Sequence, residues 1–322
     1  MNTGLKITAF AAAVAATFGT AYAVGSTADP VVQKGEQEAG GGHGGHGGGS
    51  GGNEKKPEGG GGAELPGGLQ VSQSGYTLDL ETPRLAAGEK GKLSFTVEDG
   101  IGRKVTAYDR EHGKDLHLII ASRDLDTFRH LHPSRAADGT WSTPVELPKA
   151  GGYRVFADFT PKGGEGLTLG ADLAVSGQYD PEKLPGSTTT AKVEGGYEVT
   201  LDGGLTPGKA GELKLRVSKN GKPVTDLEPY LEAYGHLVAL RSGDLAYLHV
   251  HPNEGGPGPE VSFTATAPSK GAYRLFLDFK HDGKVRTADF TVRTEGAAAP
   301  EPGKGDSSGS SHSGGSESGH AH

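Results

Sequence analysis

An internal repeat constrains this chain more than any other feature of its sequence. Leu85–Gly88 aligns with Leu205–Gly208, and Tyr153–Phe159 aligns with Tyr273–Phe279, each at an offset of 120 residues. The offset stays between 119 and 121 across the whole unit, which is the signature of two copies of one domain. We expect these copies at residues 69–176 and 192–294, with a linker at 177–191 that contains two prolines.

Each copy predicts an all-β fold. Lys92–Val97 and Glu212–Val217 alternate between polar and apolar residues, as half-buried strands do. Turn signals such as Asn220-Gly221 and Asp282-Gly283 separate such runs, and no segment has a helical period. Seven or so short strands in about 100 residues indicate an immunoglobulin-like β-sandwich. The prediction is therefore two tandem immunoglobulin-like β-sandwich domains.

The flanks of the repeats have a different composition. Residues 1–24 are almost all apolar or small and end in Ala21-Tyr22-Ala23, which predicts either a cleaved signal peptide or a membrane anchor. Both alternatives place the repeats outside the cytoplasm, in a secreted or cell-surface protein. Gly accounts for 56 of the 322 residues. Many of them lie in a Gly- and His-rich spacer at 25–68, and the tail at 295–322 is rich in Gly, Ser and His, so we expect both to be disordered.

Composition excludes several function classes. The chain has no Cys and its only Met is Met1, so disulfides, thiolate sites and Met-rich copper sites are excluded. The net charge is −8 and no basic block occurs, which argues against nucleic acid as a partner. Any metal chemistry must therefore use His, carboxylates or the backbone.

Six histidines form one pattern that is written twice. A histidine is followed after thirteen residues by a second and two residues later by a third: His117, His130 and His132, then His236, His249 and His251. Two residues of a strand at positions i and i+2 point to one face, roughly 7 Å apart. The spacing thus predicts one three-histidine metal site in each domain, and the alternative is a structural role for the histidines.

The hairpin that joins these histidines has two possible registers. A two-residue turn sets His117 opposite His130, whereas a four-residue turn sets it opposite His132. The same choice in the second copy sets His236 opposite His249 or His251. Both registers put the three imidazoles on one face of adjacent strands, where opposed side chains lie about 5 Å apart. Apolar residues share that face, so we expect partial burial: Ile119, Phe128, Val238 and Tyr247.

An aspartate lies at the end of a strand in each copy and is a candidate fourth ligand. Asp158 and Asp278 follow apolar runs, so each needs a partner if it is buried. Each could bind the metal, accept a ring N–H from a ligating histidine, or pair with Arg154 or Arg274.

Two histidines fall outside this pattern. His112 is expected to be a solvated loop residue. His281 precedes a turn and is expected to be peripheral.

The segments around the His-Leu-His-Pro and His-Val-His-Pro motifs, 117–133 and 230–252, resemble secreted actinobacterial proteins of the heavy-metal-binding kind. The likeness covers most of the chain. In architecture alone the chain is also similar to CopC-like periplasmic copper proteins, a resemblance that implies Cu(II) handling outside the cytoplasm. The chain departs from that family because no histidine stands at the expected mature N-terminus, Val24.

Imidazole ligands with at most one carboxylate suit Cu(II) or Zn(II). The first hypothesis is an extracytoplasmic metal-binding protein that sequesters or delivers one of these ions. Its expected partners are the ion and a membrane transporter or other cell-envelope protein, with membrane contact only through the N-terminal anchor. The alternative is a non-catalytic structural or protein-binding β-sandwich module. A metal-dependent enzyme is the third hypothesis, because three histidines and an open position also describe catalytic zinc. No acid–base pair or nucleophile motif accompanies them.

Overall fold

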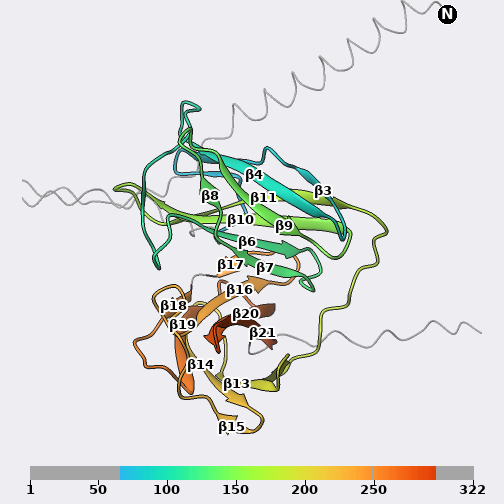
Figure 1. Cartoon of the computed structure of the whole chain (residues 1–322), viewed down its shortest axis with the longest axis vertical. Helices are drawn as coiled ribbons and strands as arrows, with labels where there is room; N and C mark the ends of the chain where they lie inside the picture. Colours follow the sequence, from blue (N-terminus) through green and yellow to red (C-terminus); the bar gives the residue numbers. More distant parts are fainter. Residues whose placement is uncertain (1–65, 249, 295–322) are drawn as a thin grey trace, which may run out of the picture. The chain divides into compact units, whose positions relative to one another are not determined.

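The computed structural model describes residues 66–294 except residue 249, and this part of the chain is built of strands that form two sandwiches (Figure 1). It confirms the all-β prediction. In the described part of the chain, no helix of membrane-crossing length and hydropathy occurs. The signal segment, most of the glycine-rich spacer and the C-terminal tail lie outside the described residues.

The first repeat is a sandwich of two sheets. One sheet has the strand order β1-β2-β4-β9-β8, and the other has the order β3-β11-β10-β6-β7, with β5 paired to β10. The strands are β1 (Ser72–Gln73), β2 (Tyr76–Asp79), β3 (Arg84–Ala86), β4 (Lys90–Glu98), β5 (Tyr108–Asp109), β6 (His117–Ser122), β7 (Phe128–Leu131), β8 (Ser134–Arg135), β9 (Trp141–Glu146), β10 (Gly151–Pro161) and β11 (Leu167–Ser176).

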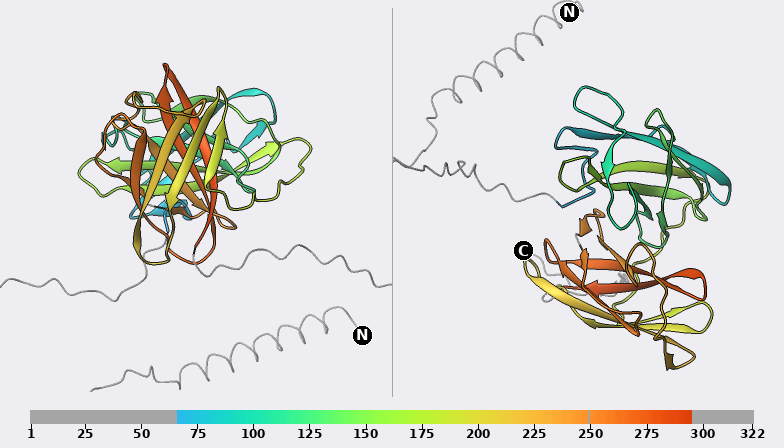
Figure 2. Two further views of the ribbon diagram at one scale, coloured as in Figure 1. Left: turned by 90° about the horizontal axis from the view of Figure 1, so that it is seen from below. Right: turned by 60° about the vertical axis from the view of Figure 1, so that its left-hand side comes forward.

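The second repeat has the same two-layer design. One sheet has the order β12-β13-β14-β19-β18, with β15 paired to β14, and the other has the order β17-β16-β20-β21. The strands are β12 (Thr190–Val193), β13 (Tyr197–Gly203), β14 (Ala210–Lys219), β15 (Lys222–Pro223), β16 (His236–Arg241), β17 (Tyr247–Leu248), β18 (Val250–Pro252), β19 (Glu260–Thr266), β20 (Ala272–His281) and β21 (Lys284–Arg293). The two layers of each sandwich can be followed in Figure 2.

Each sandwich has its own apolar core, and a third cluster joins the two repeats. Strand β6 shows how: Leu118 and Ile120 point into the core of the first sandwich, whereas Ile119 and Ala121 point away from it. The third cluster buries eight residues, four from each repeat: Ile119, Ala121, Leu125, Phe156, Val238, Leu240, Leu245 and Phe276. Both repeats accordingly belong to one compact unit.

Equivalent faces of the two repeats meet in this third cluster. Phe128 of the first repeat stacks on Phe276 of the second at a centroid distance of 4.1 Å. Tyr247, the counterpart of Phe128, lies 5.7 Å from Phe156, the counterpart of Phe276. The contact is thus made twice with the roles exchanged, as in an isologous dimer interface. The face that carries the histidines is therefore covered by the other repeat.

The β6–β7 hairpin has the register of the longer predicted turn. Ile119 pairs with His130 and Leu118 with Leu131, which sets His117 opposite His132. Ala239 pairs with Leu248 in the second repeat, in the same relative register. Both turns contain a leucine in the left-handed region, Leu125 at φ 61° and Leu245 at φ 63°. This conformation costs roughly 1–2 kcal/mol for a residue with a side chain, and both leucines bury that side chain between the repeats.

The first described residues differ from the predicted spacer, which was expected to be disordered up to residue 68. The Gly68 N–H donates to the Thr168 carbonyl of the first repeat, and the Tyr247 N–H donates to the Gly67 carbonyl. Gly68 has φ 73°, and a Cβ there would lie 2.4 Å from the Phe156 ring, so only glycine fits. Residues 66–68 therefore belong to the folded unit and contact both repeats.

Candidate metal centre

Four histidines from both repeats gather beside the apolar interface. Ligand nitrogens of His117, His130 and His236 all lie within 4.8 Å of one another. The His117 ring centroid lies 5.5 Å from that of His130, 5.2 Å from that of His132 and 5.4 Å from that of His236. The His130 centroid lies 4.9 Å from that of His132 and 4.8 Å from that of His236. The structure thus brings His236 of the second repeat into the cluster of the first.

Strand geometry explains how these rings converge. His117 begins β6 and His130 lies in β7, and both share the outward face with Ile119. His236 begins β16 and shares the outward face of that strand with Val238, which packs in the inter-repeat cluster. Because the apolar faces of the two sheets pack together, the histidines at the strand ends of both repeats meet at the margin of the apolar cluster.

Hydrogen bonds define the tautomers of two rings. His117 Nε2 lies 3.1 Å from the Glu111 carbonyl oxygen, and His130 Nδ1 lies 2.8 Å from Asp278 Oδ2. A carbonyl and a carboxylate oxygen can only accept, so both of these ring nitrogens carry hydrogen. In the neutral rings, the lone pairs then lie on His117 Nδ1 and His130 Nε2. These two atoms are 3.2 Å apart.

Two facing lone pairs at this separation repel each other unless a cation or a proton lies near them. Two nitrogens bound to one tetrahedral zinc, at bond lengths of about 2.0–2.1 Å, are roughly 3.3 Å apart. The separation of 3.2 Å between His117 Nδ1 and His130 Nε2 matches that geometry.

Burial disfavours protonation in this cluster. Desolvation, together with the smaller effect of neighbouring histidines, lowers the pKa of His117 to about 4 and that of His132 to about 3, from an ordinary value of 6.5. The pKa of His236 is also well below its usual value, chiefly because of burial. These three imidazoles are therefore neutral at neutral pH, which is the form that binds a metal.

Asp278 supports the cluster from the second repeat. Its Oδ2 accepts the His130 Nδ1 hydrogen, and its Oδ1 accepts a hydrogen bond of 2.6 Å from the Thr287 hydroxyl. The side chains of His130 and Asp278 are 2% and 4% exposed. Of the three roles considered for this aspartate, the structure places it as the acceptor of a ring N–H, across the repeat interface. Arg274, the other candidate partner, pairs with Asp289 at 2.9 Å.

Asp158 lies elsewhere. The Thr168 hydroxyl donates to its Oδ1 at 2.8 Å, and the candidate partner Arg154 pairs instead with Asp172 at 2.8 Å. The two arginines that were candidate partners thus form ion pairs with other carboxylates, Asp172 and Asp289. His249, which aligns with His130, lies outside the described residues.

The second triad does not form a separate cluster of described side chains. Among the described residues, β17 pairs with β16 as far as Leu248, and Val250–Pro252 pairs with β19 of the opposite sheet. His251 lies opposite Thr264 and is exposed. The first repeat keeps its hairpin up to Leu131, whose counterpart is Val250. The second predicted site therefore stays a prediction, because His249 lies outside the described residues.

Two residues near the cluster were not predicted. His112 has φ 48° in the two-residue turn with Gly113, and its ring lies 6.1 Å from that of His117 and 5.3 Å from that of His236. The Tyr230 ring lies 6.4 Å from that of His130 and 6.1 Å from that of His132. Burial raises the Tyr230 pKa to about 12. His112 is half-buried rather than a solvated loop residue; its spacing from the triad carries no strand signal that could have revealed this.

His281 differs from the cluster histidines. Its Nδ1 lies 2.7 Å from the Tyr197 hydroxyl and its Nε2 lies 3.1 Å from Asp226. It is buried in the second sandwich with both nitrogens paired, so it is a structural residue.

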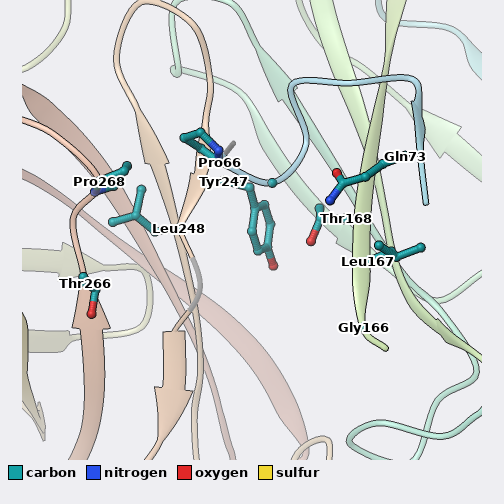
Figure 3. Close-up of a pocket in the computed structure, with 10 residues that line it drawn as sticks. Pro66, Gln73, Gly166, Leu167, Thr168, Tyr247, Leu248, Thr266 and Pro268 are labelled. Atoms are coloured by element: carbon teal, nitrogen blue, oxygen red, sulfur yellow. The ribbon is translucent and has the colours of Figure 1, made fainter. Parts of the chain in front are cut away.

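The folded unit also contains a cavity of about 430 Å³ that none of these histidines lines. Residues 66 and 67 and both repeats contribute to it, and Figure 3 shows the Tyr247 ring between Leu248 and Thr168 in that view. The Tyr247 pKa is well above its usual value because of burial and the nearby Asp158. This cavity has no cluster of ligand nitrogens, so the His117–His236 region remains the candidate metal centre.

The comparison with solved structures finds bacterial surface proteins at low similarity. The Escherichia coli adhesin FdeC is 16% identical, with a TM-score of 0.25, over 70% of this chain and 65% of the other. The Yersinia pseudotuberculosis adhesin InvE is 13% identical, with a TM-score of 0.22, over 72% of this chain and 61% of the other. Invasin, a bacterial integrin-binding protein, is 12% identical, with a TM-score of 0.22, over 68% and 39%. The chain thus spans less than two thirds of the length of each of these structures.

The comparison with curated proteins finds no match. One family model, a domain of unknown function named DUF8832, matches residues 70–177 and 191–296. These two matches cover about two thirds of the chain and coincide with the two β-sandwich repeats. The chain therefore belongs to the DUF8832 family, and it carries the family's domain twice.

Proposed function

We propose that this protein is an extracytoplasmic β-sandwich binding module that holds one Cu(II) or Zn(II) ion between its two repeats. One observation carries the proposal: the His117 Nδ1 and His130 Nε2 lone pairs face each other at 3.2 Å, with a ligand nitrogen of His236 within 4.8 Å. The neutral state of His117 and His236 and the carboxylate behind His130 support it, because ligating histidines commonly donate their other N–H to such a group. The apolar N-terminal segment supports a place outside the cytoplasm.

The sequence suggested two independent sites, whereas the described histidines favour one site shared by the repeats. Metal titration of the full chain with Zn(II) and with Cu(II) should separate these possibilities. In the shared site, His236→Ala removes a ligand of the same ion that His117 and His130 bind, so it should weaken the tightest binding event at least tenfold. If the sites were independent, a first-repeat ion would remain bound in this variant with unchanged affinity.

His251→Ala is the matched control, because His251 is exposed and its strand pairs with the opposite sheet. It removes one imidazole and leaves the cluster intact, so the tightest binding event should keep its affinity. The histidines of the spacer and tail are present in all variants, and their weak binding cancels in the comparison. Absence of any tight ion in the unmodified protein would overturn the proposal.

The second candidate is a structural or protein-binding module that needs no metal. The architecture itself favours it, since the two sandwiches are joined through an apolar face that needs no ion. This candidate also accounts for the fold without assigning a role to the histidines. It predicts that His117→Ala and His130→Ala change only the free energy of unfolding, because the unmodified protein would bind no metal ion tightly.

A further inference from the structure

A small cavity lies directly beside the histidine cluster, in the first repeat. Its volume is about 290 Å³, close to the lower end of the range for ligand pockets. His132 belongs to the cluster and also lines this cavity. The other polar or aromatic residues in its wall are Arg110, Lys114, Asp115, Arg135 and Trp141.

The wall of this cavity is positively charged. Three cationic side chains face a single carboxylate, that of Asp115. Asp115 forms an ion pair with Arg110 at 3.0 Å and a longer one with Arg135 at 3.9 Å. One carboxylate is therefore shared by two arginines, and the third positive charge, that of Lys114, has no ion pair among the described residues.

Two buried polar atoms at this wall lack a partner. In the part of the chain that the structure describes, Arg135 Nε and His132 Nε2 are buried and make no hydrogen bond. Leaving a buried polar group without a partner costs about 1–3 kcal/mol. The Arg135 guanidinium carbon also lies 5.7 Å from the ring centroids of both Tyr108 and Trp141, so the two aromatic rings hold the guanidinium group in place.

The second repeat has an equivalent cavity of different chemistry. It is lined by Pro252, which aligns with Pro133 of the basic cavity, and its volume is about 570 Å³. Ala233 stands where the first repeat has Lys114, and Glu254 stands where it has Arg135. The basic character is therefore a property of the first repeat, and the fold of the repeat does not require it.

We propose that the basic cavity of the first repeat binds a small oxyanion, a phosphate or carboxylate group. The Arg135 fork donates Nε–H and Nη–H in the parallel geometry that such groups accept, and the Lys114 ammonium adds a positive charge. Because His132 lines both features, the bound oxyanion lies next to the histidine cluster. The site consists of protein groups alone and does not require the metal of the proposed function.

Trp141 provides the measurement, because it lines the cavity and is the sole tryptophan of the chain. Metal-free full-length protein is titrated with inorganic phosphate and, separately, with acetate, at constant ionic strength of about 0.15 M to screen diffuse attraction. We expect a saturable change in tryptophan fluorescence. Lys114→Gln should weaken it about tenfold, Lys114→Arg should preserve it within about threefold, and Arg135→Lys should weaken it because the fork is lost.

Lys222→Gln is the matched control, an exposed lysine removed from the second repeat with the same change in net charge. It should bind the anion as the unmodified protein does. The proposal is overturned if neither anion gives a saturable change, or if Lys114→Gln and Lys222→Gln lose affinity equally. Saturable anion binding in a protein that takes up no metal would refute the proposed function and leave this site standing.

Discussion

The residues of the histidine cluster act as a set because their hydrogen bonds leave lone pairs facing inward. His130 depends on a residue of the other repeat: Asp278 accepts its Nδ1 hydrogen and thereby leaves Nε2 free to bind a metal. His117 depends instead on the backbone carbonyl of Glu111. Sequence spacing identified both histidines and offered three roles for Asp278, but it could not show that the aspartate serves a histidine of the opposite repeat.

Asp278→Asn tests this support at the residue scale. An amide can present its N–H to His130 Nδ1, which would favour the wrong tautomer, so metal affinity should fall about 10–100-fold. Isothermal titration with Zn(II) measures the change. Asp289→Asn is the control, since Asp289 pairs with Arg274 on the neighbouring strand and is half exposed. Equal losses in the two variants would contradict a specific role for Asp278.

At the scale of elements, the β6–β7 and β16–β17 hairpins bring the histidines together through apolar packing. Alternation along β6 correctly predicts that His117 shares a face with Ile119, and the register follows one of the two predicted turns. The second predicted site stays a prediction, because His249 lies outside the described residues and His251 lies opposite Thr264 of the other sheet. The point at which a strand moves from one sheet to the other depends on packing at the sandwich corner. It cannot be read from the His-x-His-Pro motif, because both hairpins contain that motif.

Phe276→Ala should therefore weaken metal binding although Phe276 is not a ligand. Its ring stacks on Phe128 across the interface, and its loss should cost roughly 3–5 kcal/mol of unfolding free energy and loosen the position of His236. Phe263→Ala removes a buried ring from the core of the second sandwich instead. Below its unfolding temperature, that variant should bind metal within about threefold of the unmodified protein; the same loss in both variants would mean that the interface does not organise the site.

At the scale of the whole molecule, the two repeats form one folded unit whose shared face holds neutral histidines. A neutral imidazole can be buried between the repeats without removing a charge from water. Protonation inside the cluster is disfavoured by desolvation and by the other histidine rings. The metal-free protein is thus expected to be sensitive to mild acid. At neutral pH the apolar interface holds the repeats together, and it includes the side chains of Leu125 and Leu245.

The pH dependence has a definite sign. With the pKa of His117 lowered to about 4 from 6.5, the unfolded chain binds more protons than the folded one between these values, so stability is complete above pH 6.5 and falls as the pH falls towards 4. The slope is at most about 1.4 kcal/mol per pH unit for this histidine, and smaller for the half-buried His132, because solvent screens it. Urea unfolding of metal-free protein at pH 7.0 and 5.5 measures the loss. If the double variant His117→Gln, His132→Gln loses as much unfolding free energy between pH 7.0 and 5.5 as the unmodified protein, other groups cause the pH dependence.

Repetition and alternation in the sequence by themselves determined the two-sandwich architecture, the histidine face of β6 and the apolar residues that share it. These features are local, because strand geometry sends every second side chain to one side wherever the strand lies. Only the tertiary structure decided that the outward faces of the two repeats cover each other and that His236 joins His117. Which apolar face meets which depends on the complementarity of surfaces distant in the chain, and Asp278, His112 and Tyr230 reach the cluster only through that meeting.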